Sequence, residues 1–301
     1  MESNHPLVSI IIVTYNSEYT VAETLESAIN QSYDNVEIII SDDCSRDNTV
    51  NVVLSWIEQN ASRFRGNIKF LTSEANQGVC KNFNKAIRSS LGDYIKIIAG
   101  DDKLLPDCCK DYVNFVNENP EAHFVTSFVQ VFNNTFEERN RVDSTRTKVV
   151  PSVFSKPANV QLKMMAFYIF VSAPTMYFSR QLYDKVGGFD EHYLYEDHPF
   201  YINILESEEK IYMMPKETVA YRIHDSSYNS NCKLFNYNFS RSSRNFRKER
   251  CYKYYGFRQK IAVEAYYSTL TIFERLHLNK KTKFLHFLYH ALTGAIWAIG
   301  R

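Results

Sequence analysis

The first half of the chain alternates between β-branched runs and stretches whose apolar residues recur with helical spacing. The runs cover residues 8–13, 36–40, 68–71 and 94–99, and the helical stretches cover 20–30, 48–59 and 78–90. Pro106 suits the start of a further helix, and Asp47 suits the N-cap of the helix at 48–59. Because strands that alternate with helices form parallel sheets, this pattern predicts an α/β fold, a mostly parallel sheet with helices on both faces.

The second half of the chain has a less regular pattern. Residues 124–132 and 175–178 are strand-like, and the stretches with helical spacing are 160–170, 180–186 and 196–205. Residues 133–157 are polar and charged, which predicts a loop over a site. From Lys233 onward the spacing is helical, with aromatic and basic side chains interleaved, so we expect a helical C-terminal extension.

Polar residues follow each of the four predicted parallel strands. They are Thr14, Tyr15 and Asn16 after the first strand, Asp42 and Asp43 after the second, Asn76 after the third, and Asp101 and Asp102 after the fourth. Ligands of open α/β sheets bind beyond the carboxyl ends of the strands. We therefore expect one crevice lined by all four strand ends.

The adjacent carboxylates of Asp101 and Asp102 predict a divalent cation site. Two carboxylates at one strand end repel each other unless a positive group is present, and Mg²⁺ or Mn²⁺ prefers such oxygen ligands. The alternative is a turn with a helix N-cap before Pro106. For Asp42 and Asp43 the alternatives are turn and capping roles, or a hydrogen bond from one carboxylate to a nucleobase N–H.

Charge is divided unevenly along the chain, although the formal net charge is only +1. Residues 233–301 carry 14 Lys and Arg against 3 Asp and Glu, a local charge of +11, and the remainder carries −10. This division predicts two parts with different partners. The basic part suits a solvated helix face, an anionic membrane surface or nucleic acid. We prefer the membrane surface to the solvated helix face. Nucleic acid comes last, because nothing else in the chain indicates it.

Six cysteines without C-x-x-C spacing and no visible signal peptide favour reduced thiols in a cytoplasmic protein. The longest apolar stretch, residues 284–299, contains two histidines. It falls short of the ~20 residues that a spanning helix needs. With Trp297 it suits an interfacial position, so we expect peripheral contact with the inner face of the plasma membrane.

Several segments, taken together in this order, resemble the family 2 glycosyltransferases. They are VSIIIVTYNS at 8–17, SDDCSRDNT at 41–49, NQGV at 76–79, GDYIK running into AGDD at 92–102, GGFDE followed by ED at 187–197, and YRIH at 221–224. The resemblance covers about the first three-quarters of the chain. It implies the GT-A fold, an inverting mechanism and a catalytic domain over 1–232, with a nucleotide-binding part at 1–105 and an acceptor-side part at 106–232. The basic, aromatic helical region at 233–301 lies outside the resemblance.

The resemblance implies a role for each matching position. Asp101 would bind Mn²⁺ or Mg²⁺ with His224 as a second ligand, and Asp197 would be the catalytic base, supported by Glu196. Charge at a helix N-terminus is the alternative for these last two carboxylates. The family's D-x-D has an aspartate where this chain has Ala99, so one carboxylate contact to ribose or metal is missing. The donor-binding residues would be Thr14, Tyr15, Asn16, Asp42, Asp43, Asn76, Lys81, Asp102 and Arg222.

These expectations describe an enzyme that moves a sugar from a nucleotide-diphosphate donor to an acceptor hydroxyl. By resemblance, the donor is UDP-hexose or UDP-N-acetylhexosamine, and the acceptor is a glycan or lipid-linked oligosaccharide for surface polysaccharide assembly. The alternative is a non-catalytic nucleotide-sugar or glycan-binding module, which Ala99 favours and Asp101, Asp102 and Asp197 oppose. An oxidoreductase would need G-x-G-x-x-G after the first strand, and residues 14–17 contain no glycine.

Overall fold

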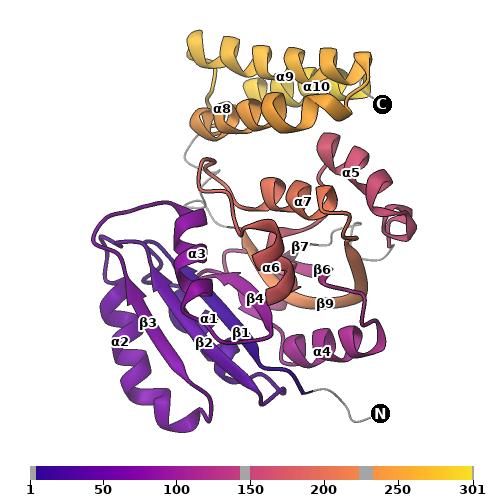
Figure 1. Cartoon of the computed structure of the whole chain (residues 1–301). Coiled ribbons are helices and arrows are strands. Elements are labelled where there is room, and N and C mark those ends of the chain that lie inside the picture. The colour runs from indigo at the N-terminus through magenta and orange to yellow at the C-terminus, as the bar shows by residue number, and fades with distance from the viewer. Residues whose placement is uncertain (1–4, 143–149, 224–232, 300–301) are drawn as a thin grey trace.

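The computed structural model describes residues 5–142, 150–223 and 233–299, and its strands form one mixed sheet (Figure 1). The sheet order is β3-β2-β1-β4-β8-β6-β9-β5, and β7 pairs with β6. The first four strands along the chain pair in parallel: β1 (Val8–Thr14), β2 (Val36–Asp42), β3 (Ile68–Thr72) and β4 (Tyr94–Ala99). Their order places the carboxyl ends of all four strands at one edge of the sheet.

The remaining strands extend this sheet past β4. The antiparallel strand β8 (Tyr177–Ser179) lies between β4 and β6 (Phe124–Asn133), and β9 (Tyr212–Ile223) runs parallel to β6. Two short antiparallel strands, β5 (Lys103–Leu104) and β7 (Arg141–Val142), complete it. The sheet is therefore mostly parallel, as predicted.

Helices cover both faces of the sheet, and the reason is the burial of its central strands. All seven residues of β1 are buried, and alternate residues such as Ile11 and Ile12 belong to different apolar clusters on opposite faces. One cluster packs against α1 (Val21–Ile29), α2 (Thr49–Asn60) and α4 (Cys108–Glu118). The other packs against α3 (Val79–Arg88), α5 (Ala158–Phe167), α6 (Arg180–Val186) and α7 (Asp197–Glu206).

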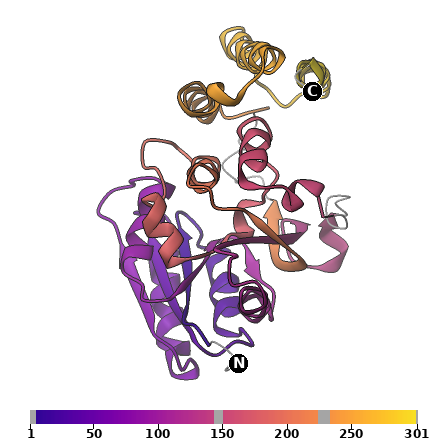
Figure 2. The same ribbon diagram turned by 45° about the vertical axis from the view of Figure 1, so that its right-hand side comes forward.

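The C-terminal region is helical and lies at the opposite end of the molecule from α2 (Figures 1 and 2). It contains α8 (Tyr237–Phe246), α9 (Phe257–Arg275) and α10 (Lys283–Ile299), with a π-helical turn at Arg247–Cys251. Phe246 and Cys251 are fully buried in the same cluster as α7. The buried Arg247 guanidinium donates to the carbonyl oxygen of Ala166 at 3.0 Å, so this region packs directly on the rest of the chain.

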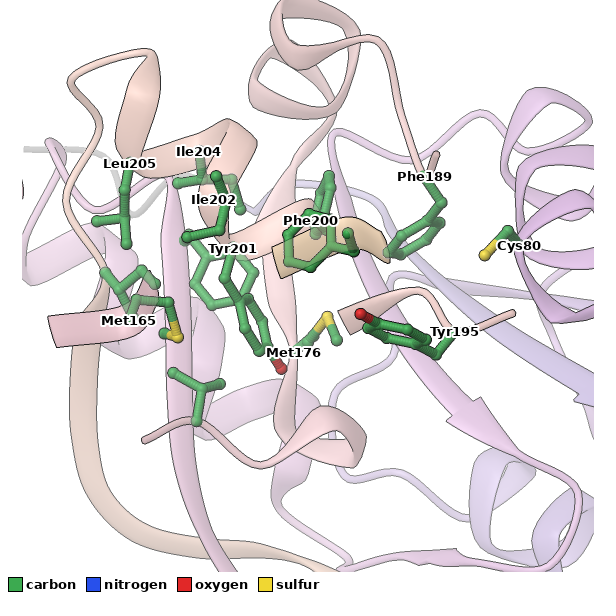
Figure 3. Close-up of a cluster of buried hydrophobic side chains, with 14 of the residues drawn as sticks. Cys80, Met165, Met176, Phe189, Tyr195, Phe200, Tyr201, Ile202, Ile204 and Leu205 are labelled. Atoms are coloured by element: carbon green, nitrogen blue, oxygen red, sulfur yellow. The ribbon is translucent and has the colours of Figure 1, made fainter. Parts of the chain in front are cut away.

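The core beneath α7 is rich in large side chains (Figure 3). Phe200, Tyr201 and Ile204 are fully buried there, and the Phe189 ring lies 4.5 Å from the Phe200 ring. Cys80, from α3, lies beside Phe189 in the same view. Residues 187–197, which lie in the predicted acceptor-side part and are named the acceptor-side segment below, are therefore anchored by Phe189 in a packed core.

Some predicted boundaries differ from the structure for identifiable reasons. The helix expected at 48–59 begins at Thr49 with Asn48 as its N-cap, and Asp47 accepts the Thr49 N–H at 3.0 Å from one position earlier. The helix expected at 160–170 ends at Phe167, since Tyr168 is extended. The expected loop at 133–157 contains β7 and 3-10 turns at Glu138–Asn140 and Ser152–Ser155.

The cysteines within the described residues are free thiols. No helix in the described part of the chain is long and apolar enough to cross a membrane.

Candidate active site

The ends of β1 and β2 are tied together by buried polar side chains. The Thr14 hydroxyl donates to Oδ2 of Asp42 at 2.8 Å, and Asp42 also accepts the Ser45 N–H at 2.8 Å. Asp42 exposes no surface, so its carboxylate shapes the loop. Asn16 adopts a left-handed φ of 52° and donates its N–H to the Ser45 hydroxyl at 2.8 Å. Tyr15, between these anchored residues, is 45% exposed.

Asp43 joins the end of β2 to the start of α3. Its two carboxylate oxygens accept the backbone N–H groups of Gln77 and Gly78 at 2.9 and 2.8 Å. Gly78 has a φ of 92°, a left-handed conformation that favours glycine. The predicted donor contacts Asn76 and Lys81 are exposed on either side of this turn. Asp43 therefore fixes the turn between Asn76, on the loop before α3, and Lys81, in the first turn of α3.

The turn after β4 is held closely against β1. The Gly100 N–H donates to the carbonyl of Val13 at 2.9 Å, and the Thr20 hydroxyl donates to the carbonyl of Gly100 at 2.7 Å. A Cβ at position 100 would lie 2.8 Å from Cγ2 of Thr14, so only glycine fits without a shift. Asp101, the next residue, is half-buried.

Arg222 on β9 binds the same turn from the other side. Its backbone N–H donates to Oδ1 of Asp102 at 2.9 Å, and its Nε donates to the carbonyl of Asp101 at 2.8 Å. The remaining guanidinium nitrogens donate to the carbonyl of Asn134 and to the carboxylate of Glu23. The predicted contact with a diphosphate stays a prediction, and the observed contacts give Arg222 a part in positioning the turn.

Asp102 is almost fully buried. Burial raises the pKa of its carboxyl well above the ordinary range, and the neighbouring Asp101 charge raises it further. Below it, the ammonium of Lys96 is fully buried and donates to the carbonyls of Ile97 and Pro174 at 2.9 and 2.5 Å. Lys96 thus links β4 to the segment before β8. The sequence pattern placed Lys96 in a strand and did not predict this role.

The acceptor-side segment is held by Asn84, which the sequence analysis missed. Its side chain donates to the carbonyl of Phe189 at 2.8 Å and to Glu191 at 2.9 Å, and accepts the Phe189 N–H at 3.0 Å and the Tyr183 hydroxyl at 2.7 Å. Gly188 has a φ of 77°, and a Cβ there would lie 2.8 Å from the Tyr183 ring. One amide therefore determines how this segment leaves α6. The signal was an asparagine on the buried face of α3.

Cys80 contacts the same segment close to Asp197, the predicted catalytic base. Its thiol lies 3.6 Å from the carbonyl oxygen of Tyr193. Burial raises the pKa of this thiol, and the nearby carboxylates of Glu196, Asp190, Glu191 and Asp197 raise it further. Because Cys80 lies one turn from the Asp43-bound loop, α3 contacts the donor-side loops at its start and the acceptor-side segment along its length.

Glu196 and Asp197 are adjacent carboxyl groups at the start of α7. Asp197 is the first residue of the helix, and its Oδ1 accepts the His198 N–H at 2.6 Å. Burial raises the pKa of Asp197, and burial together with the Asp197 charge raises the pKa of Glu196 to about 8. Both side chains keep partial exposure. A carboxyl group with a raised pKa and a partly exposed side chain is suited to accept a proton.

A polar hollow of about 290 Å³ adjoins this segment. It is bounded on one side by the acceptor-side segment and on the other by the first helices of the C-terminal region. Tyr193 donates its hydroxyl to Glu249 at 2.7 Å across the hollow, and Asp190 pairs with His192 at 2.9 Å. Its lining residues are Asp190, His192, Tyr193, Ser242, Asn245 and Glu249.

Asp101 and Asp102 are the predicted metal ligands that lie within the described residues. Asp101 and Asp102 offer hard oxygen ligands, whereas Ala99 offers none, and the described residues contain no cluster of three His, Cys, Asp or Glu side chains arranged for a metal. His224 lies outside the described residues. Mg²⁺ and Mn²⁺ commonly take one or two carboxylates and complete their shell with water and substrate phosphates. The residues present fit that type of site.

Several relatives with curated names are glycosyltransferases. The chain is 25% identical over 287 residues to an uncharacterized glycosyltransferase of Haemophilus influenzae, an alignment that covers 94% of this chain and 84% of the relative. It is 27% identical over 228 residues to WfaP of Escherichia coli, named as a UDP-Glc:α-D-GlcNAc-diphosphoundecaprenol β-1,3-glucosyltransferase, with 75% and 80% covered.

Solved structures with the same fold include complexes with nucleotide sugars. TarS 1–349 of S. aureus in complex with UDP-GlcNAc matches with a TM-score of 0.60 at 18% identity, covering 98% of this chain and 82% of TarS. The mannosyltransferase PcManGT of Pyrobaculum calidifontis, in complex with GDP-Man and Mn²⁺, matches with a TM-score of 0.56 at 16% identity, covering 99% and 74%.

The family model described as glycosyl transferase family 2 matches residues 9–186, more than half of the chain. This span contains β1 to β4, the turn with Asp101 and Asp102, and Asn84. The predicted fold and family are both confirmed, and the chain is an enzyme that belongs to glycosyltransferase family 2.

Proposed function

We propose that this glycosyltransferase moves a hexose or N-acetylhexosamine from a UDP donor to a hydroxyl of a glycan or lipid-linked acceptor, with inversion. One observation carries the proposal: α3 links the donor-side loops to the acceptor-side segment. Asp43 binds the turn at Gly78, and Asn84 and Cys80 contact the segment that leads to Asp197. Surface polysaccharide assembly at the cytoplasmic side of a membrane is the setting that suits this chemistry.

The donor nucleotide is proposed to lie over the ends of β1 and β2. Tyr15 offers an exposed ring for the base, while Thr14, Asn16 and Asp42 hold the loop around it. Asp42 or Asp43 is the carboxylate proposed to meet the base N–H, and both are buried and hydrogen-bonded to the surrounding loops. Asn76 and Lys81 approach the donor from the loop before α3 and from its first turn. UDP is supported by the UDP-GlcNAc bound to TarS and by the UDP-Glc donor in the name of WfaP.

The diphosphate is proposed to meet the turn after β4. Asp101 would bind Mg²⁺ or Mn²⁺, Asp102 would hold the donor sugar or a metal-bound water, and His224 is the second predicted ligand. The cation, when bound, would neutralise charge that develops on the leaving diphosphate. The Mn²⁺ complex of PcManGT supports this assignment. Arg222 fixes the two aspartates for that contact.

The acceptor hydroxyl becomes a competent nucleophile when a base removes its proton. Asp197 takes that proton, and attack opposite the diphosphate inverts the anomeric centre. Glu196, protonated beside it, keeps the pair from carrying two charges. The hollow between Asp190 and Glu249 is the proposed position of the acceptor sugar, because its carboxylates and hydroxyls can bind sugar hydroxyls. A lipid-linked acceptor is supported by the name of WfaP.

A donor screen with matched variants tests the proposal. Release of UDP from UDP-glucose, UDP-galactose and their N-acetyl forms is measured with Mn²⁺ and an acceptor saccharide. We expect turnover of one donor, and Asp197→Asn should lower kcat by at least ~10²-fold. Asp184→Asn, an exposed position on α6, is the control and should act as the wild type. The product's anomeric configuration, read by NMR, checks inversion.

The second candidate is a binding module without catalysis, which Ala99 favours. It predicts that a UDP-sugar binds, as titration calorimetry would show, while no UDP is released from any donor by wild type or by Asp197→Asn. That pair of results would overturn the enzyme mechanism and retain the fold and family.

A further inference from the structure

Helix α10 is apolar on the side that faces solvent as well as on the side that packs. Its packed side includes Thr293, which is buried, and Trp297, whose ring lies 5.1 Å from the Phe167 ring. On the opposite side the exposed residues recur at helical spacing. They are Phe284, Phe287, Ala291, Ala295 and Ala298, which we name the outer face of α10.

The outer face exposes large apolar side chains. Phe284 is 70% exposed and Phe287 is 72% exposed, and Leu276, at the end of α9, is 62% exposed. A helix that is apolar all round is normally covered on every side. Within the described residues, nothing covers the outer face.

Cations gather where the outer face begins, and anions are absent from this stretch of sequence. Arg275, Lys280, Lys281 and Lys283 are all exposed around the α9–α10 connection. From residue 275 to residue 301 the sequence has five Lys and Arg and no Asp or Glu. The preceding acid, Glu274, accepts the Asn279 side-chain N–H at 2.8 Å and pairs with Lys233 at 3.7 Å.

We infer that the outer face of α10 and these cations form a docking surface for an anionic lipid bilayer. Aromatic side chains on a helix that lies along an interface insert below the headgroups, and nearby lysines attract anionic headgroups. The helix lies on the membrane, since no described helix is long and apolar enough to cross one. A second copy of the chain fits less well, because two such faces would bring like charges together.

The docking surface is tested by vesicle flotation of the full chain without donor or metal. Wild type should bind vesicles of phosphatidylglycerol and phosphatidylethanolamine, and bind phosphatidylcholine vesicles far less. The pair Phe284→Asp and Phe287→Asp, and separately the triple change of Lys280, Lys281 and Lys283 to Glu, should each weaken binding at least ~tenfold.

Matched controls lie far from the outer face. Leu91→Asp changes a side chain that is 77% exposed, and a triple change of Arg65, Lys69 and Lys110 to Glu carries the same charge reversal. Both controls should bind vesicles as the wild type does. UDP release in solution, measured without vesicles, should be equal in all these proteins, which separates lipid docking from the transfer reaction.

Three results would overturn the inference. The first is no binding of wild type to anionic vesicles, and the second is equal loss of binding in the controls. The third is a dimer in light scattering that Phe284→Asp and Phe287→Asp convert to monomer, which would assign the outer face to a second copy of this chain.

Discussion

The backbone N–H of Arg222 donates to Oδ1 of Asp102 at 2.9 Å, although the two residues lie 120 positions apart. Through its side chain, the same arginine also binds the carbonyl of Asp101 and the carboxylate of Glu23. The proposed metal-binding turn is therefore held by a strand from the far half of the sheet.

Arg222→Lys should destabilise the protein by about 2 kcal/mol. A lysine ammonium cannot reach Glu23 and the carbonyls of Asp101 and Asn134 together, since it lacks the planar fork of the guanidinium. Urea unfolding measures the change. Arg63→Lys, on an exposed ion pair with Glu26, is the control and should cost under ~0.5 kcal/mol. Equal stability of Arg222→Lys and wild type would contradict the clamping role.

Asp101→Asn should lower kcat/KM by about 10²-fold or more, because an amide is a weaker ligand for a hard cation than a carboxylate. Unfolding stability should stay near that of wild type, since the side chain is half-buried at a turn. Activity titrated with Mn²⁺ should reach half its maximum at a higher Mn²⁺ concentration in the variant. An unchanged Mn²⁺ requirement would argue against Asp101 as a ligand.

Gly100→Ala should destabilise the chain by about 1–3 kcal/mol, because its Cβ would lie 2.8 Å from Cγ2 of Thr14. Thr14→Ser removes that methyl group and keeps the hydroxyl that donates to Asp42. The double variant should recover part of the lost stability in thermal unfolding. Additive losses in the double variant would show that the clash is not with Thr14.

Asn84→Ala should reduce transfer to an acceptor at least ~tenfold while binding of UDP stays unchanged, since the side chain contacts the acceptor-side segment alone. Loss of its hydrogen bonds to Phe189, Glu191 and Tyr183 should also destabilise the fold by about 2–3 kcal/mol. UDP affinity by calorimetry and transfer by product assay separate the two effects. Asn51→Ala, on the surface of α2, is the control.

The raised pKa of Glu196, about 8, makes stability depend on pH. Below pH 4.5 the carboxyl is protonated in both states. Between pH 4.5 and 8 the unfolded chain loses a proton that the folded chain retains, so stability falls as pH rises through this window and levels above it. Glu196→Gln removes this effect. Its stability relative to wild type should rise by about 2 kcal/mol from pH 5 to pH 8, and a constant difference in urea unfolding would disprove the shift.

Much of the fold follows from local pattern. The β-branched runs that became β1, β2 and β4 are buried on both faces, and such runs have few other conformations open to them. The antiparallel insertion of β8 and the parallel return of β9 were not predictable, because pairing partners depend on contacts between distant segments. The two-residue strands β5 and β7 carry too few residues to show a period.

The position of the candidate site residues was predicted more fully than their contacts. The sequence predicted that Asp43 and Asp101 follow neighbouring parallel strands, and sheet geometry brings such strand ends together. The sequence did not show that the Asp42 carboxylate accepts hydrogen bonds from Thr14 and Ser45, or that Lys96 is buried. Both features depend on which neighbours the folded chain supplies.

The ten residues of α3 form a rod about 15 Å long, with the proposed donor loop at its start and the proposed acceptor-side segment on its flank. Under the proposed assignment, this rod sets the separation between donor and acceptor independently of the loops at either side. Selectivity for either sugar can then change by replacing surface loops, while the spacing between reacting atoms stays constant.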